Sequence, residues 1–228
     1  MISYEVDLMK LRKGKQKRAS AVDRSLLDSW NPKTELGRKV KAKEIVSLYD
    51  ILKSGKPILE SEIVDVLLPN LMQETIELSS TQRMTDSGRK AKYRAVVVVG
   101  DGQEYIGIGQ GKADEVRPAI EAAVRDAKYN IIHVNLGCGS SQCDCGLKHS
   151  LPIQVTGKHG GVRITLRPAP RGTGIVANKI VKKVLQLAGI KDIWTKAEGR
   201  TKNRFNSSMA VVDALDQLNR IRVKKEFS

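Results

Sequence analysis

Three alternating glycines, Gly107, Gly109 and Gly111, lie between an apolar run and a long amphipathic segment. Because side chains alternate along a strand, glycine at every second position removes the side chains from one face. The phosphate-binding motifs do not fit: a Rossmann pattern needs glycine where Lys112 stands, and a P-loop needs it at Ile106. Two interpretations remain, namely close packing of a helix on this strand and close approach of a bulky backbone beside Lys112.

The residues around these glycines predict a β-hairpin followed by a helix. Residues 95–99 have the composition of a buried strand, and the sequence Gly-Asp-Gly at 100–102 predicts a turn into a second strand over 104–111. Apolar residues spaced for one helical face then predict a helix over about 114–130, with Asp114 as its cap.

The chain carries far more positive charge than solubility requires. Its 228 residues include 40 Lys and Arg against 25 Asp and Glu, a net charge of +15, which predicts a polyanionic partner. Because aromatic residues make up only 4%, we expect contacts with the phosphates and shape of structured RNA rather than base stacking. Without an 18-residue apolar run or a signal-peptide core, the chain is expected to be cytoplasmic and not membrane-associated.

A basic segment, residues 82–94, precedes the hairpin and is predicted to be a loop. A solvated charged loop is one interpretation. We favour phosphate contact, because glycine frees the backbone to follow a groove. The candidate contact residues in this segment are Arg83, Ser87, Gly88, Arg89, Lys90, Lys92 and Arg94.

A cluster of soft metal ligands follows the central helix. Three thiols and an imidazole make a complete tetrahedral zinc set, and a site closed by four protein ligands would be structural. Free thiols on a loop, or one disulfide with a cysteine left over, are the alternatives that the spacing leaves open. The candidate ligands of Zn2+ are Cys138, Cys143, Cys145 and His149.

The chain before the hairpin is predicted to be an extension. It contains a basic arm at residues 10–18, then a helix over about 34–52 capped by Thr34, then a short helix capped by Ser61 and ended at Pro69. Residues 57–82 contain several acids but no Lys or Arg, so we expect this segment to face protein or solvent rather than RNA.

The chain after the cysteine cluster is predicted to be a second domain of order β-β-α-β-α, ending in a basic tail. Strands are expected at 151–156 and 162–166, a helix at 177–188, a strand at 190–195 and a helix from Asn206 or Ser207. His133 lies in an apolar run and is expected to be packed, and the chain has no catalytic motif, so we do not expect an enzyme. A zinc-dependent RNA-processing enzyme and a general double-stranded-RNA regulator are the competing hypotheses.

Several stretches together resemble the small-subunit ribosomal protein S-five family in its archaeal and eukaryotic branch, and archaeal members most. The resemblance covers most of the chain beyond residue 29. The matching stretches are WNPKTELGRKV (30–40), ESEIVDVLLP (60–69), TDSGRKAKYRAVVVVGD (85–101), GIGQGKADEV (107–116), HSLPIQVTGKHGGVRITLRPAPRGTGIV (149–176) and LAGIKDIWTKAEG (187–199).

The resemblance implies an α+β fold in three parts: a partly helical extension at 1–83, a double-stranded-RNA-binding-like domain at 84–148, and a C-terminal S-five-type domain at 149–228. It implies a non-enzymatic constituent of the small ribosomal subunit that binds rRNA near the body–head junction. The family packs on ribosomal protein S-four among other small-subunit proteins, contributes to decoding accuracy and lies near the side where mRNA enters.

The resemblance also implies further RNA contacts, and it favours the second interpretation of the glycine strand, in which rRNA backbone comes close. The cysteine cluster of this chain resembles that of archaeal members. Other branches of the family lack it, so the resemblance does not imply zinc for the whole family. The additional contact residues are Gly109, Gly111, Lys112, Arg171, Gly172, Thr173, Gly174, Arg200, Lys202 and Asn203.

Overall fold

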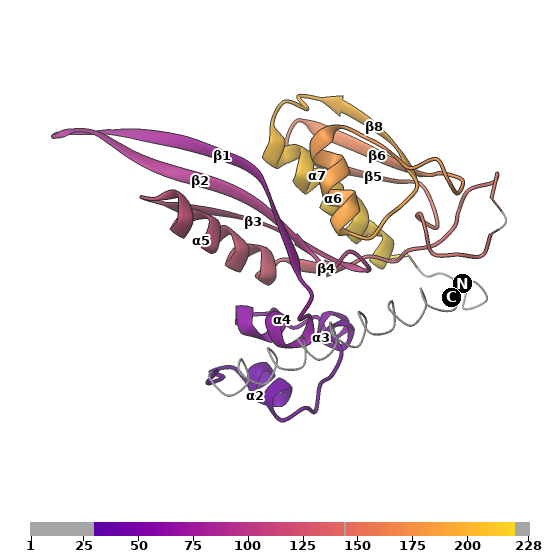
Figure 1. The fold of residues 1–228 in the computed structure, drawn as a ribbon, viewed down its shortest axis with the longest axis horizontal. Coiled ribbons are helices and arrows are strands. Elements are labelled where there is room, and N and C mark those ends of the chain that lie inside the picture. The colour runs from indigo at the N-terminus through magenta and orange to yellow at the C-terminus, as the bar shows by residue number, and fades with distance from the viewer. Residues whose placement is uncertain (1–29, 144, 222–228) are drawn as a thin grey trace, which may run out of the picture. The chain divides into compact units, whose positions relative to one another are not determined.

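The computed structural model describes residues 30–143 and 145–221 and divides into two compact units between Leu71 and Met72 (Figure 1). The predicted basic arm at 10–18 and most of the basic tail lie outside the described residues. The division comes earlier than the expected boundary at residue 83, because the segment from Met72 onward joins the first sheet as a long strand.

The described part of the first unit, residues 30–71, forms three short helices, α2 (Glu35–Lys41), α3 (Leu48–Lys53) and α4 (Ser61–Leu67). Thr34 caps α2 as predicted. The single helix expected over 34–52 is wrong, since α2 ends at Lys41 with Ala42 as its C-cap, and Lys43 follows with φ +60°, a left-handed conformation that stops a helix. Ser61 is the first residue of α4 rather than its cap.

Glu60 joins the segment before α2 to the start of α4. Its carboxylate accepts hydrogen bonds from the indole Nε1 of Trp30 at 3.0 Å and from the backbone N–H groups of Lys33 at 2.9 Å and Thr34 at 2.6 Å. Burial raises the pKa of Glu60, but the hydrogen bonds from Thr34, Lys33 and Trp30 outweigh it and hold the pKa below 4.5. The ionised carboxylate is therefore the form that this unit requires.

The second unit begins with an antiparallel sheet whose strand order is β1-β2-β3-β4. The predicted hairpin around residues 100–102 is confirmed. The basic segment at 82–94 is not a loop, however: it forms the tip of a two-stranded arm that turns at Gly88, which has φ +126°. The strands are β1 (Met72–Thr85), β2 (Gly88–Gly100), β3 (Tyr105–Ala113) and β4 (Ile131–His133).

Helix α5 (Val116–Tyr129) covers one face of this sheet by packing on the glycines of β3. A Cβ at Gly107 would lie 2.2 Å from the carbonyl oxygen of Ala127, and one at Gly109 would lie 2.2 Å from the amide nitrogen of the same alanine. Close helix-on-strand packing is therefore confirmed. The predicted cap is wrong, because the residue before the helix is Glu115 and its side chain makes no capping bond.

The second sheet has the strand order β5-β6-β8-β7, in which the short β7 is parallel to β8. β5 starts at Val155, later than predicted, and just before the predicted start Ser150 forms an isolated bridge with Gly137. α7 starts earlier than predicted, because Asn203 caps it. The elements are β5 (Val155–His159), β6 (Val162–Pro168), β7 (Ile175–Val176), α6 (Lys179–Leu187), β8 (Ile193–Gly199) and α7 (Arg204–Asn219).

Buried residues of the two sheets belong to one hydrophobic core cluster. Val96 and Ile108 of the first sheet belong to the same buried cluster as Leu185 of α6 and Leu215 of α7. Helices α6 and α7 thus lie on the face of the first sheet opposite α5. Within the described ranges, none of the helices has the length and apolar character needed to cross a membrane.

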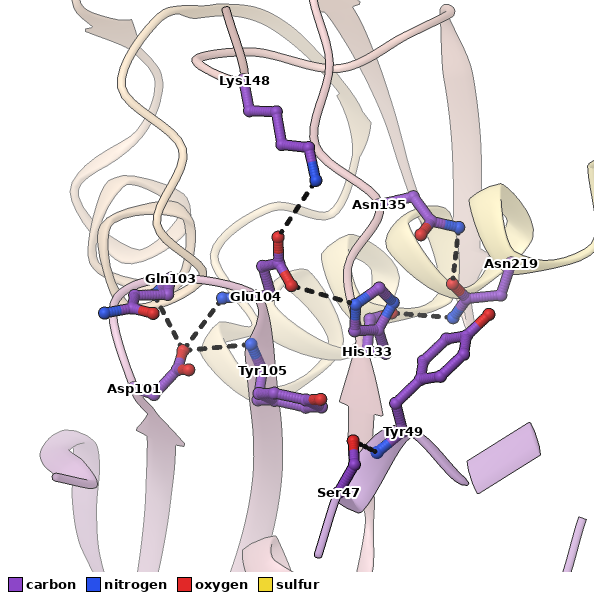
Figure 2. A network of polar contacts seen from close by, with 10 residues as sticks. All are labelled: Ser47, Tyr49, Asp101, Gln103, Glu104, Tyr105, His133, Asn135, Lys148 and Asn219. Carbon is purple, nitrogen blue, oxygen red and sulfur yellow. Dashed lines mark hydrogen bonds and ion pairs between the residues drawn. The ribbon is translucent and has the colours of Figure 1, made fainter. Parts of the chain in front are cut away.

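Polar contacts join the β2–β3 turn to the end of α7 (Figure 2). Glu104 lies 3.4 Å from Nε2 of His133 and 3.6 Å from Nζ of Lys148. Asn219 of α7 donates to the backbone carbonyl of His133 at 2.8 Å. The His133 side chain is 14% exposed, and its ring meets Tyr105 edge-on at 5.3 Å, so the expected packed histidine is confirmed.

Candidate nucleic-acid interface and metal centre

Cationic side chains gather on one face of the β1–β2 arm. In the strand register Arg83 lies opposite Lys90, Thr81 lies opposite Lys92, and Arg94 lies opposite Lys112 of β3. Residues directly opposite each other in an antiparallel pair point to the same side, so these pairs share one face. Together with neighbouring residues of the arm, Arg83, Lys90, Lys92 and Lys112 line a groove of about 630 Å³. We call this surface the arm groove.

The arm groove lies on the face of the sheet opposite α5. Gly107, Gly109 and Gly111 alternate with the groove-side residues of β3, and helix α5 packs directly against the face of the strand on which they lie. Both Gly109 and Gly111 are buried, so α5 rather than an RNA backbone occupies the side that lacks side chains. The expected RNA contact at these two glycines stays a prediction, and Lys112 is the exposed cation that β3 supplies.

Arg94 differs from the other cations of the arm. Its guanidinium carbon lies 5.2 Å from the centre of the Phe205 ring at the start of α7, and its Nε atom is buried. This geometry is a cation–π contact that links the first sheet to α7. We therefore assign Arg94 to packing. Phe205 was not singled out from the sequence, because its partner lies on a distant strand.

Ser87, Gly88 and Arg89 form the tip of the arm. The hydroxyl of Ser87 and that of Thr85 lie 3.5 Å apart, and Thr85 donates to the carbonyl of Gly88 at 2.7 Å, which stabilises the turn. Arg89 is exposed and, because side chains alternate along β2, points away from Lys90, although its register partner Met84 is among the residues that line the arm groove. The predicted RNA residues of this segment are thus brought near one another but divided between two faces.

The predicted contacts between β8 and α7 are also divided. Arg200 and Lys202 are exposed cations. Asn203 has a structural role, because its side chain accepts a hydrogen bond from the N–H of Asn206 at 3.2 Å and so caps α7. A cap signal of this kind can be read from the sequence, since asparagine is favoured at the position before a helix.

The cysteine cluster is assembled in the structure. One ligand atom from each of Cys138, Cys143, Cys145 and His149 lies within 4.8 Å of the others. His149 Nε2 is 3.3 Å from the sulfur of Cys138 and 3.7 Å from that of Cys143. Zinc bond lengths place ligand atoms about 3.5–3.8 Å apart in a tetrahedron, so the donor set fits zinc. The disulfide alternative is wrong, because all three cysteines are free.

The thiols of the cluster have unequal acidity. The backbone N–H of Arg171, which hydrogen bonds Cys143, is the main cause that lowers the pKa of this thiol to about 6. Burial raises the pKa of Cys138. A thiolate is the form that binds metal, so Cys143 is prepared to bind at neutral pH. The same contact brings the loop at 168–174 beside the cluster.

That loop contains Arg171, Gly172, Thr173 and Gly174 of the predicted RNA set. The Arg171 side chain is exposed, while the N–H groups of Gly172 and Gly174 donate to Oδ1 of Asp192 at 3.0 and 2.8 Å. Figure 1 shows the arm tip and the loop after β4 at opposite ends of the second unit. The predicted RNA residues therefore do not form one patch, because those of the arm lie far from those of the loop beside the metal ligands.

Family models match two separate segments of the chain. Residues 71–135 match the family model described as ribosomal protein S5, N-terminal domain, and residues 157–226 match ribosomal protein S5, C-terminal domain. The chain is 53% identical over 194 residues to the small ribosomal subunit protein uS5 of Methanospirillum hungatei, covering 85% of this chain and 95% of that protein. The chain belongs to the ribosomal protein S5 family. Members of this family are structural proteins, so the chain is not an enzyme.

Further archaeal members of the S5 family are about as similar. The uS5 protein of Aeropyrum pernix is 50% identical over 88% of this chain and 90% of its own length. That of Methanocaldococcus jannaschii is 49% identical over 88% and 92%. The S5 N-terminal match begins beside the unit boundary at Leu71, and it makes the first sheet with α5 the double-stranded-RNA-binding-like domain of the family. The four metal ligands lie between the two matched segments.

Proposed function

We propose that this S5-family chain is a structural constituent of the small ribosomal subunit that binds rRNA through the arm groove. The observation that carries this proposal is the row of cations formed by Arg83, Lys90, Lys92 and Lys112 on one face of the double-stranded-RNA-binding-like domain. The relatives are named as small ribosomal subunit proteins, which supports the same assembly for this chain. The net charge of +15 supports a polyanionic partner.

The arm groove suits phosphates better than bases. Its lining contains cations and the polar Thr81 and Gln82 but no aromatic ring. The ion pair of Lys92 with Asp114, 3.4 Å long and exposed, is of the kind that contributes little and that a phosphate can displace. Arg200, Lys202 and Arg171 are proposed as further contacts with rRNA.

The position within the subunit is proposed from the S-five resemblance. The chain would bind near the body–head junction, pack on ribosomal protein S-four, contribute to decoding accuracy and lie near the side where mRNA enters. Its place would be the ribosome in the cytoplasm. The acidic Glu74 is consistent with a protein-facing role for β1, because it pairs with Lys183 of α6.

A structural Zn2+ is proposed at Cys138, Cys143, Cys145 and His149. Four protein ligands fill the coordination of zinc, so the site would fix the loop between the two matched segments and would not activate water. A zinc-dependent RNA-processing enzyme needs an open metal position, which this ligand set does not provide. Metal analysis of the purified full chain should give about one equivalent of zinc, falling strongly in Cys143→Ser.

Sucrose-gradient sedimentation tests the proposed function. The full chain, added to small subunits from which this protein has been removed, is expected to sediment with the subunit. Association with arbitrary double-stranded RNA but not with the subunit would instead favour a general regulator. A chain that stays at the top of the gradient under both conditions would contradict the proposal.

A further inference from the structure

Asp192 is a buried carboxylate that connects the metal ligands to a proposed RNA loop. Its Oδ2 atom lies 2.9 Å from Nδ1 of His149, and both residues are 5% exposed. Its Oδ1 atom accepts the N–H groups of Gly172 at 3.0 Å and Gly174 at 2.8 Å. One carboxylate oxygen of Asp192 therefore contacts a metal ligand and the other contacts the 170–174 turn, so the side chain connects the two.

This contact determines which ring nitrogen of a metal-bound His149 carries the hydrogen. Its Nε2 atom faces the thiols of Cys138 and Cys143 and needs a free lone pair to bind a metal. The ring proton must then lie on Nδ1, where it donates to Asp192. A carboxylate behind a ligating histidine fixes its tautomer and orientation and makes it a better ligand.

The loop depends on the same carboxylate. Gly172 and Gly174 have φ of +90° and +71°, left-handed conformations that aim both N–H groups at one oxygen. Thr173 closes the turn by donating its hydroxyl to the carbonyl of Pro170 at 2.8 Å. The exposed Arg171 lies at the start of this turn. If Asp192 moves, the acceptor for two of the turn's amides moves with it.

We propose that Asp192 is a positioning residue that makes the conformation of the loop at 170–174 depend on metal bound by Cys138, Cys143, Cys145 and His149. The inference rests on the proposed structural zinc. Metal binding holds the His149 ring, the ring holds Asp192, and Asp192 holds the turn that presents Arg171. Because coupling is reciprocal, a partner that binds the ordered turn also raises the affinity for zinc.

Hydrogen exchange at two amides reports on the link directly. The full chain would be compared with and without one equivalent of Zn2+, and exchange followed at the N–H groups of Gly172 and Gly174. Zinc is expected to slow both by about 5- to 150-fold, the range of ordinary coupling between sites. Equal exchange rates in the zinc-loaded and zinc-free chain would overturn the proposal.

Asp192→Asn separates the two halves of the link. The amide oxygen can still accept from the turn, but the NH2 group cannot accept the His149 proton. Zinc affinity is expected to fall about 10- to 100-fold. The response of the two glycine amides to zinc is expected to become much smaller than in the unaltered chain, because the N–H of Arg171 on Cys143 is the contact that remains between the turn and the ligands. Asp213→Asn is the matched control: Asp213 pairs with His159 at 3.3 Å in the same unit and should leave both readouts unchanged.

His149→Cys keeps four metal ligands and removes the side-chain contact with Asp192 while leaving the backbone bond from Asp192 N–H to the carbonyl of residue 149, so it carries the test if Asp192→Asn does not fold. It should bind zinc, while the exchange of Gly172 and Gly174 responds to zinc much less than in the unaltered chain. A response as large as that of the unaltered chain would overturn the proposal. A chain that binds no zinc at all would instead refute the proposed metal centre, and metal analysis before each exchange measurement distinguishes the two failures.

Discussion

The guanidinium of Arg94 lies over the ring of Phe205, with 5.2 Å between the guanidinium carbon and the ring centre. The arginine comes from β2 and the phenylalanine from α7, so the contact joins the two family domains beside the arm groove. The contact gives Arg94, which is also one of the predicted RNA contacts, a structural role in holding the arm.

Replacing Arg94 should therefore lower stability. Arg94→Ala is expected to reduce the free energy of unfolding by about 0.5–2 kcal/mol, the range for a partly buried cation–π contact. Denaturant unfolding measures this change, and a double-mutant cycle with Phe205→Leu isolates the pair. Arg89→Ala, at an exposed position on the opposite face, is the control and should change stability by less than about 0.5 kcal/mol. Additive effects of Arg94→Ala and Phe205→Leu would show that the two do not interact.

A side chain at Gly109 should disrupt the packing of α5. A Cβ there would lie 2.2 Å from the amide nitrogen of Ala127 and 2.3 Å from the carbonyl oxygen of Ala123. Both are backbone atoms of α5, so the helix itself would have to shift. Gly109→Ala is expected to cost about 1–3 kcal/mol or more of unfolding free energy. Gly161→Ala is the control, because a Cβ there meets nothing within 4 Å. Equal melting temperatures for the two variants would refute the close packing.

The stability of the first unit should depend on pH through Glu60. Its pKa is lowered on folding, so its contribution is present above the unfolded value of 4.5 and is lost as pH falls through the lower folded value. Fluorescence of Trp30, whose indole donates to Glu60, follows this loss in a Trp194→Phe background. Glu60→Gln should flatten the acid transition, while Glu62→Gln, at an exposed position, should preserve it. An acid transition unchanged in Glu60→Gln would assign it to another group.

The strong local periodicities were readable from the sequence. The hairpin at 100–102 and helix α5 were predicted because a β-branched run, a turn signal and an amphipathic repeat follow one another without interruption. The strand β1 was missed because its polar and acidic residues, half exposed along its length, lack a strand pattern. Only its pairing with β2, which one sequence does not reveal, makes it a strand.

The metal ligands were predictable because they are close in sequence, whereas the link behind them was not. Asp192 lies 43 residues from His149, and nothing in its local sequence marks a buried acceptor. For the glycines of β3, the spacing correctly indicated a strand face without side chains. Only the structure shows that α5 packs against that face.

Salt-dependent rRNA binding tests the central proposal most directly. The affinity of the full chain for small-subunit rRNA would be measured over a salt series beside a variant with Arg83, Lys90 and Lys112 changed to alanine. Each lost phosphate contact should reduce the slope of log affinity against log salt by about 1, so the three changes should reduce it by about 3 and weaken binding at low salt.

The matched control removes the same charge from exposed lysines of the first unit, Lys39, Lys53 and Lys56. It lowers net charge equally without touching the arm groove. The arm-groove variant is predicted to bind more weakly and with a shallower slope than this control. Identical affinities and slopes for the two variants would contradict rRNA binding by the arm groove.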